Sequence, residues 1–154
     1  MIGLLQRVLD AYVEVDGKRL AAIGAGLLVL VGVRRDDDES SAVRLIERII
    51  DYRAFADEGG KMNLSLRQTG GALLLVPQFT LAADTRKGLR PGFSAAAPPA
   101  QGRRVYDELV EAARKRHPCV ETGVFGAYMR VSLTNDGPVT LWLESCSAVR
   151  GPTS

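Results

Sequence analysis

Apolar and polar positions alternate along the first third of the chain and predict β-structure there. The segments 2–8 and 11–15 are rich in strand-forming residues in this alternating pattern. The Asp-Gly dipeptide at 16–17 is typical of a tight hairpin turn, so 19–23 is the expected returning strand. The continuous apolar run 27–33 is typical of a strand that is covered on both faces.

The rest of the chain changes between helical and strand periods. The acidic run 36–39 predicts a helix start, because negative side chains stabilise the free N–H groups of a first turn. Apolar residues at helical spacing follow from 42 to 50, with Arg53 next on the same face, and a second helix is expected to end near His117. Further strands are expected at 62–66, 72–76, 128–133 and 139–144. This order predicts an α+β fold, a mainly antiparallel sheet or barrel with two helices packed on one face.

The length and the absence of any linker predict one domain. The chain has 154 residues, of which 1–145 carry the pattern and are expected to form that single domain. The tail 146–154 has no pattern and is expected to be flexible. The stretch 83–100 is rich in Pro, Gly and Ala and has no periodicity, and a loop of this length is usually functional or disordered.

Composition excludes several kinds of chemistry. Apolar residues make up 46% and charged residues 25% of the chain, and no apolar run reaches the roughly 18 residues of a membrane span. We find no secretory signal, and we expect a cytoplasmic protein without a membrane partner. One histidine and two cysteines cannot fill a four-ligand zinc site without carboxylates, and no zinc-ligand spacing is present, so we expect no metal and no cofactor. A catalytic triad would have to use His117 at the end of a helix.

Three segments carry polar residues that a purely structural account leaves open. Gln78 and Thr80 end an apolar strand, where side chains often meet ligands, although an edge strand also accounts for them. Thr80 could be a nucleophile only with a nearby base, and the sequence offers no obvious one. The segment 135–140 is a good hairpin turn, but its Gly-Pro pair could also adopt a cis bond and expose two carbonyl groups.

The third segment is the basic loop 84–93. The net charge is only +2, which allows a nucleic-acid partner without requiring one. Basic side chains in the loop could contact phosphate groups, with a second basic spot at 114–116, although such runs are more often solvated faces. The loop's basic residues are Arg86, Lys87 and Arg90.

Seven stretches of the chain together form a specific pattern. They are QRV (6–8), VDG (15–17), GKMNLS (60–65), QFTLAADTRKG (78–88), RPGFSAAAPP (90–99), VETGVFGAYM (120–129) and NDGPVT (135–140). With these stretches in this order, the chain resembles the D-aminoacyl-tRNA deacylase family over about residues 1–145.

The resemblance implies a homodimer with its active sites at the subunit interface. The enzyme would hydrolyse the ester that joins a D-amino acid, or glycine, to the terminal ribose of tRNA. It implies that Gln78, Phe79 and Thr80 line the pocket for the aminoacyl group and the terminal adenosine. The vicinal ribose hydroxyl would assist the reaction.

The resemblance also assigns the selecting and tRNA-binding residues. Gly137 and Pro138 would be a cis pair that one subunit inserts into its partner's pocket, oriented by Arg7 and packed beside Met129. Their fixed carbonyls would collide with an L side chain and admit glycine or a D-amino acid. The acceptor end of tRNA would be held by Arg86, Lys87, Arg90 and Phe93, with Arg114 as a further phosphate contact.

Pro77 departs from the family pattern, in which most members carry Ser at this position. A related branch that removes L-alanine from tRNA favours Pro there. One alternative is therefore an editing deacylase with relaxed chirality that also accepts L-alanine. Another alternative is a nucleic-acid-binding module that retains the fold without hydrolysis.

Overall fold

A long, bent first strand organises the sheet. The computed structural model describes residues 1–147, and residues 148–154 of the expected flexible tail lie outside the described part. The two expected strands 2–8 and 11–15 form one strand, β1. The strands are β1 (Ile2–Val15), β2 (Lys18–Ile23), β3 (Gly26–Gly32), β4 (Phe55–Ala56), β5 (Met62–Leu64), β6 (Ala72–Pro77), β7 (Val120–Thr122) and β8 (Arg130–Glu144). The helices are α1 (Glu39–Asp51), α2 (Leu66–Thr69), the 3₁₀ turn η1 (Phe79–Ala82) and α3 (Pro99–Arg116).

The main sheet has six strands and is mixed. Its order is β2-β1-β3-β6-β7, and β8 pairs with β1. The pairs that include β1 are antiparallel, whereas β3–β6 and β6–β7 are parallel. The expected α+β class is confirmed, and the parallel half of the sheet is an addition to it.

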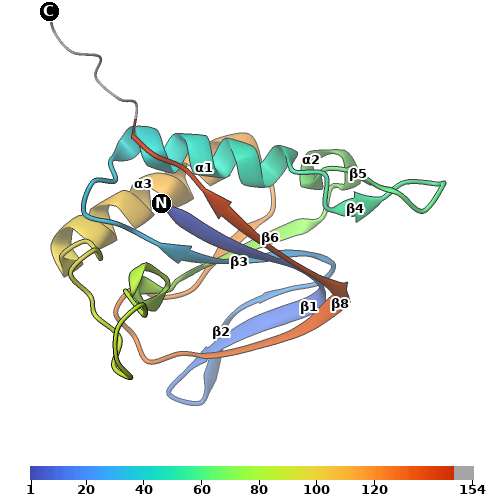
Figure 1. Ribbon diagram of the computed structural model, residues 1–154. Coiled ribbons are helices and arrows are strands. Elements are labelled where there is room, and N and C mark those ends of the chain that lie inside the picture. Colours follow the sequence, from blue (N-terminus) through green and yellow to red (C-terminus); the bar gives the residue numbers. More distant parts are fainter. Residues whose placement is uncertain (148–154) are drawn as a thin grey trace, which may run out of the picture.

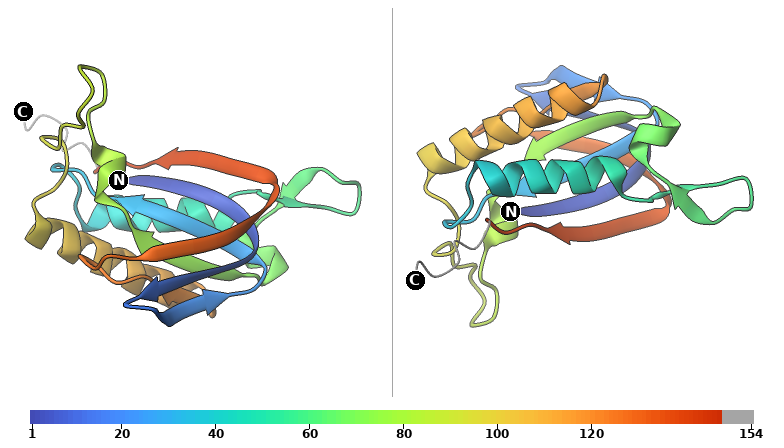
Figure 2. Two further views of the ribbon diagram at one scale, coloured as in Figure 1. Left: turned by 90° about the horizontal axis from the view of Figure 1, so that it is seen from below. Right: turned by 90° about the horizontal axis from the view of Figure 1, so that it is seen from above.

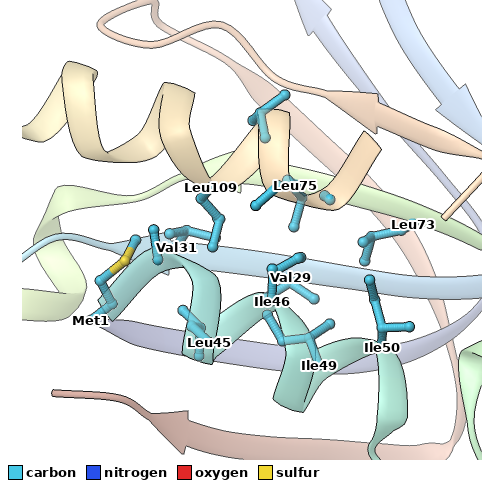
Figure 3. Close-up of a cluster of buried hydrophobic side chains, with 14 of the residues drawn as sticks. Met1, Val29, Val31, Leu45, Ile46, Ile49, Ile50, Leu73, Leu75 and Leu109 are labelled. Carbon is cyan, nitrogen blue, oxygen red and sulfur yellow. The ribbon is translucent and has the colours of Figure 1, made fainter. Parts of the chain in front are cut away.

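Two helices lie side by side on one face of the sheet, as expected (Figures 1 and 2). The buried side chains of α1 point toward β3 and β6, and Leu109 of α3 closes the same cluster (Figure 3). The residues of α1 in this core are Ala42, Leu45, Ile46, Ile49 and Ile50, which the helical spacing in the sequence identifies.

The other face is covered by the sheet itself. β1 pairs with β3 through its first half and with β2 through its second half, so the sheet curls and β2 packs over β6. Val8, Val13 and Ile23 pack there against Leu28 and Leu74 in a second buried cluster. The result is the barrel-like curl that Figure 2 shows from below.

The acidic run before α1 has two separate roles. Asp38 begins the helix, since its carboxylate accepts the Ser41 N–H at 3.1 Å and its own N–H bonds the Ser41 hydroxyl at 3.3 Å. Asp37 is buried and pairs at 2.6 Å with the α-ammonium group of Met1. That ammonium group also donates to the Ser145 carbonyl at 2.6 Å. These contacts join the start of β1 to the end of β8.

The segment 135–138 corrects the hairpin-turn interpretation. The expected strands 128–133 and 139–144 both pair with β1 in the same direction, so they are two parts of one strand, β8. No chain reversal separates them. The segment is instead an outward bulge in β8, which Figure 1 shows bending beside β1. No helix among residues 1–147 has the length and apolar character needed to cross a membrane.

Candidate active site

Gln78, Phe79 and Thr80 follow the carboxyl end of β6 and form a short surface, which we call the Gln78 wall. The Gln78 N–H donates to the Val31 carbonyl at 2.7 Å, and the chain then leaves the sheet through η1. The Gln78 side-chain amide donates to the Thr80 hydroxyl. Phe79 is 59% exposed although it is a large apolar side chain. An exposed aromatic ring beside a polar pair is suited to contact a ligand.

The loop after η1 adds a second aromatic ring to this wall. Phe93 lies against Phe79, with 5.2 Å between ring centroids and planes tilted by 52°. Two backbone hydrogen bonds between Asp84 and Gly92, of 2.7 and 2.9 Å, close the base of the loop. They carry the chain back toward Phe79. The structure thus brings together two residues that the sequence assigned to different roles.

The basic residues of this loop are exposed at its tip, but they are not equivalent. The Arg86 guanidinium forms a two-pronged contact with the Asp84 carboxylate, at 2.9 and 2.8 Å. These hydrogen bonds hold the pKa of Asp84 well below its usual range. Lys87 and Arg90 lie exposed farther along the loop. Arg114 is exposed in the last turn of α3 and belongs to a different element.

Met129 lies at the wall on β6, beside Pro77. A Cβ atom built on Gly123 would lie 2.9 Å from the Met129 sulfur and 3.3 Å from Pro77 Cδ, so these three residues are packed closely. The Val124 N–H also points to the Met129 sulfur at 3.3 Å. Within one chain, Met129 therefore lies close to Pro77, the residue that precedes Gln78.

The bulge of β8 forms the other half of the candidate site. Val8 pairs with Asn135 and Gln6 with Thr140, so residues 136–139 lie opposite Arg7 alone. The Gly137-Pro138 peptide bond is cis, and both residues are exposed.

Arg7 connects this bulge to the start of the β4–β5 hairpin. Its Nε donates to the Asp136 carbonyl at 2.9 Å, and its Nη1 donates to the buried Ala54 carbonyl at 2.8 Å. The orienting role that the resemblance implies for Arg7 is thus consistent with direct contact to the residue before Gly137.

The two halves lie at opposite ends of the sheet. Arg7 pairs with Leu27, and Leu27 pairs with Leu73 near the beginning of β6, whereas Gln78 follows the end of that strand. Five positions of extended chain from Leu73 to Gln78 correspond to about 16 Å. Figure 1 shows η1 and the bend of β8 at opposite sides of the molecule. One chain does not bring Gly137 and Pro138 to the Gln78 wall.

Sequence reasoning assigned no individual role to Asn135. Its side chain makes three hydrogen bonds inside the bulge, which depend on a register that no local pattern reveals. In the sequence, the one indication of this role is the Asn just before the Gly-Pro pair. A hairpin turn accounts equally well for an Asn at that position.

Comparison with known proteins agrees with this architecture. The model of the family described as D-Tyr-tRNA(Tyr) deacylase matches residues 4–144. A D-aminoacyl-tRNA deacylase of Thioalkalivibrio sulfidiphilus is 62% identical over 144 residues, which are 94% of this chain and 97% of the relative. The one of Azotobacter vinelandii is 59% identical over 145 residues, which are 94% of this chain and all of the relative.

Two solved structures share the fold. One, titled "c-Myc DNA Unwinding Element Binding Protein", has a TM-score of 0.90 at 38% identity and covers 94% of this chain and 99% of its own. The other, titled as a probable eukaryotic D-amino acid tRNA deacylase, has a TM-score of 0.81 at 17% identity over 93% of this chain and 98% of its own. At that identity it supports the fold alone. By the matching family model and its curated relatives, the chain belongs to the D-Tyr-tRNA(Tyr) deacylase family and is an enzyme of that hydrolase family.

Proposed function

We propose that this enzyme hydrolyses the ester of D-aminoacyl-tRNA, and of glycine misattached to tRNA, in a homodimer whose two chains complete each site. Family membership supports the reaction. The observation that supports a homodimer is the distance along the sheet between the Gln78 wall and the pair Gly137 and Pro138. A second copy could supply the Gly-Pro pair to the wall, which the same chain cannot do.

The bulge is suited to select by excluding L-amino acids. Gly137 and Pro138 are exposed in the bulge of β8 and carry no polar side chain, so the pair could present its carbonyl groups to a neighbouring molecule. A fixed carbonyl pair would collide with an L side chain while a hydrogen atom or a D arrangement passes. Each tenfold of rejection requires only about 1.4 kcal/mol. Such a filter needs no pocket for a particular D side chain.

The wall favours catalysis assisted by the tRNA itself. The hydrogen-bond partner of Thr80 is the Gln78 amide, and an amide is no base in either of its orientations. We therefore assign Gln78, Phe79 and Thr80 to orienting the ester and the terminal adenosine. The vicinal ribose hydroxyl would position or activate the water.

The basic loop would hold the acceptor end. Phe93 extends the apolar wall, and Lys87 and Arg90 are exposed and available for phosphate contacts. Arg86 would exchange its contact with Asp84 for a phosphate group. Because aminoacyl-tRNA is the substrate, we expect the enzyme to work in the cytoplasm without a metal, a cofactor or a membrane.

A matched deacylation assay tests this proposal. It compares D-Tyr-tRNA, Gly-tRNA, L-Tyr-tRNA and L-Ala-tRNA at one enzyme concentration. Hydrolysis of the first two alone is the expected result. Hydrolysis of L-Ala-tRNA as well would support relaxed chirality, and Pro77→Ser would then test whether Pro77 is responsible. Hydrolysis of none would make the protein a binding module.

A further inference from the structure

The bulge of β8 lacks the hydrogen bonds that would normally hold a strand. Four residues, 136–139, lie opposite the single residue Arg7, so most of their backbone groups have no counterpart on β1. An unsupported loop of this kind would move freely at its exposed tip. A filter that rejects substrates by collision needs a tip that does not move.

The side chain of Asn135 replaces the missing hydrogen bonds. Its Oδ1 accepts the Val139 N–H at 2.7 Å, and its Nδ2 donates to the Val139 carbonyl at 3.1 Å. The same Nδ2 donates to the Thr140 hydroxyl at 3.0 Å. One amide thus satisfies both backbone groups of Val139, which requires a donor and an acceptor on the same side chain.

The bulge is consequently fixed at both ends. Arg7 holds the Asp136 carbonyl at the first end, and Asn135 holds Val139 at the second. Val139 also buries its side chain, which is 8% exposed. Only Gly137 and Pro138 between these two ends are exposed.

We propose that Asn135 is a positioning residue that sets the selectivity for D-amino acids through the hydrogen bonds it makes across the bulge. This inference rests on the proposed function. Asn135 acts on the substrate only through Gly137 and Pro138. Loss of its amide lets the tip yield to an L side chain, while the Gln78 wall keeps its contacts with the substrate.

Two variants and one matched control test the role. Asn135→Ala removes all three hydrogen bonds. Asn135→Asp keeps an acceptor for the Val139 N–H but places a carboxylate against the Val139 carbonyl. The control is Asn63→Asp in β5, where the exposed amide oxygen accepts only a 3.3 Å hydrogen bond from Arg53. Each protein is assayed on D-Tyr-tRNA and L-Tyr-tRNA, and hydrogen exchange of the Val139 amide is measured.

The expected result is a change in selectivity in a folded protein. In Asn135→Ala the Val139 amide exchanges at least about tenfold faster. The ratio of D-Tyr to L-Tyr turnover falls at least about tenfold, while the KM for D-Tyr-tRNA stays within about twofold. Asn135→Asp also lowers the ratio, because its carboxylate lies against the Val139 carbonyl, and Asn63→Asp behaves as the unmodified protein.

Two results overturn the inference while leaving the proposed function in place. One is an unchanged ratio in the folded Asn135→Ala variant. The other is a parallel loss of both activities in proportion to the unfolded fraction. If the unmodified protein does not hydrolyse D-Tyr-tRNA, the proposed function is wrong, and the assigned selectivity role is wrong with it.

Discussion

The hydroxyl of Thr80 takes its hydrogen bond from the Gln78 amide, and this pairing leads to a prediction about catalysis. We expect Thr80→Ala to retain D-Tyr-tRNA hydrolysis within about tenfold of the unmodified rate, because the alanine removes a contact and no nucleophile. Single-turnover hydrolysis measures the effect, with Thr80→Ser as the control. A loss of more than about 10⁴-fold with intact tRNA binding would restore the nucleophile hypothesis.

Gly137 permits a test of the bulge itself. Its φ is +143°, and an added Cβ would lie 2.7 Å from Val139 Cγ2 and 3.2 Å from Arg7 Nη2. Gly137→Ala should therefore displace the tip and reduce D-Tyr-tRNA turnover by about tenfold or more, with a loss of stability of only about 1–2 kcal/mol. Turnover and chemical denaturation are measured on the same preparation.

The control for this change is Gly17→Ala. Gly17 also has a positive φ, of +76°, but an added Cβ there would meet nothing within 4 Å. It should lose comparable stability without losing turnover. If the turnover of Gly137→Ala falls only in proportion to its unfolded fraction, the bulge has a structural role alone.

At the scale of single residues, the sequence identified candidate site residues but not which of them lie in contact. Phe79 and Phe93 were both noted, yet their ring contact depends on how the Asp84–Gly92 bridge closes the loop. Met129 lies beside Pro77 within one chain, and its expected contact with a partner's Gly-Pro pair stays a prediction. Such groupings depend on contacts between distant segments, which a single sequence does not encode locally.

At the scale of secondary-structure elements, the paired strands β3 and β6 approach each other so closely at Gly26 that no side chain fits there. A Cβ on Gly26 would overlap the Ala72 carbonyl oxygen and lie 2.7 Å from the Ala72 nitrogen. Since both are backbone atoms of a paired strand, they cannot move independently. Gly26→Ala should cost about 3 kcal/mol of unfolding free energy or prevent folding.

Urea denaturation measures this cost, with Gly24→Ala as the control. Gly24 is only two positions away, and a Cβ there would meet nothing within 4 Å. The control should stay within about 0.5 kcal/mol of the unmodified protein. Equal losses in the two variants would contradict the close approach of β3 and β6.

Local pattern predicted the elements whose period is unbroken. The spacing in 42–50 identified the buried face of α1, and the apolar run 27–33 identified β3. The Asp-Gly turn before β2 was also predicted correctly. β8 was divided because Asn, Asp, Gly and Pro form turns in most contexts, and here pairing with β1 on both sides determines the outcome. The short β4, β7 and α2 have too few residues to show a period.

At the scale of the whole molecule, the curled sheet sets the distance between the Gln78 wall and the bulge of β8. It places the wall after β6 and the bulge of β8 about 16 Å apart along the strands, at opposite ends. A symmetric pair of chains would remove this separation, because a two-fold axis that brings one bulge to the partner's wall also brings the partner's bulge to the first wall. Sequence pattern alone does not give that distance, since it follows from the strand registers.

Complementation between two variants of reduced activity tests this arrangement, with the residual activity of each variant alone subtracted. One variant carries Gln78→Ala and Phe79→Ala and keeps its bulge, and the other carries Gly137→Ala and keeps its wall. After co-expression in equal amounts, half of the dimers are mixed, and each mixed dimer has one site with both halves intact. We expect about a quarter of the unmodified activity to return. Sizing of the unmodified protein should give twice the 16.6 kDa mass of one chain. No recovered activity in purified mixed dimers would mean that each chain builds its own site, and the proposed dimer mechanism would be wrong.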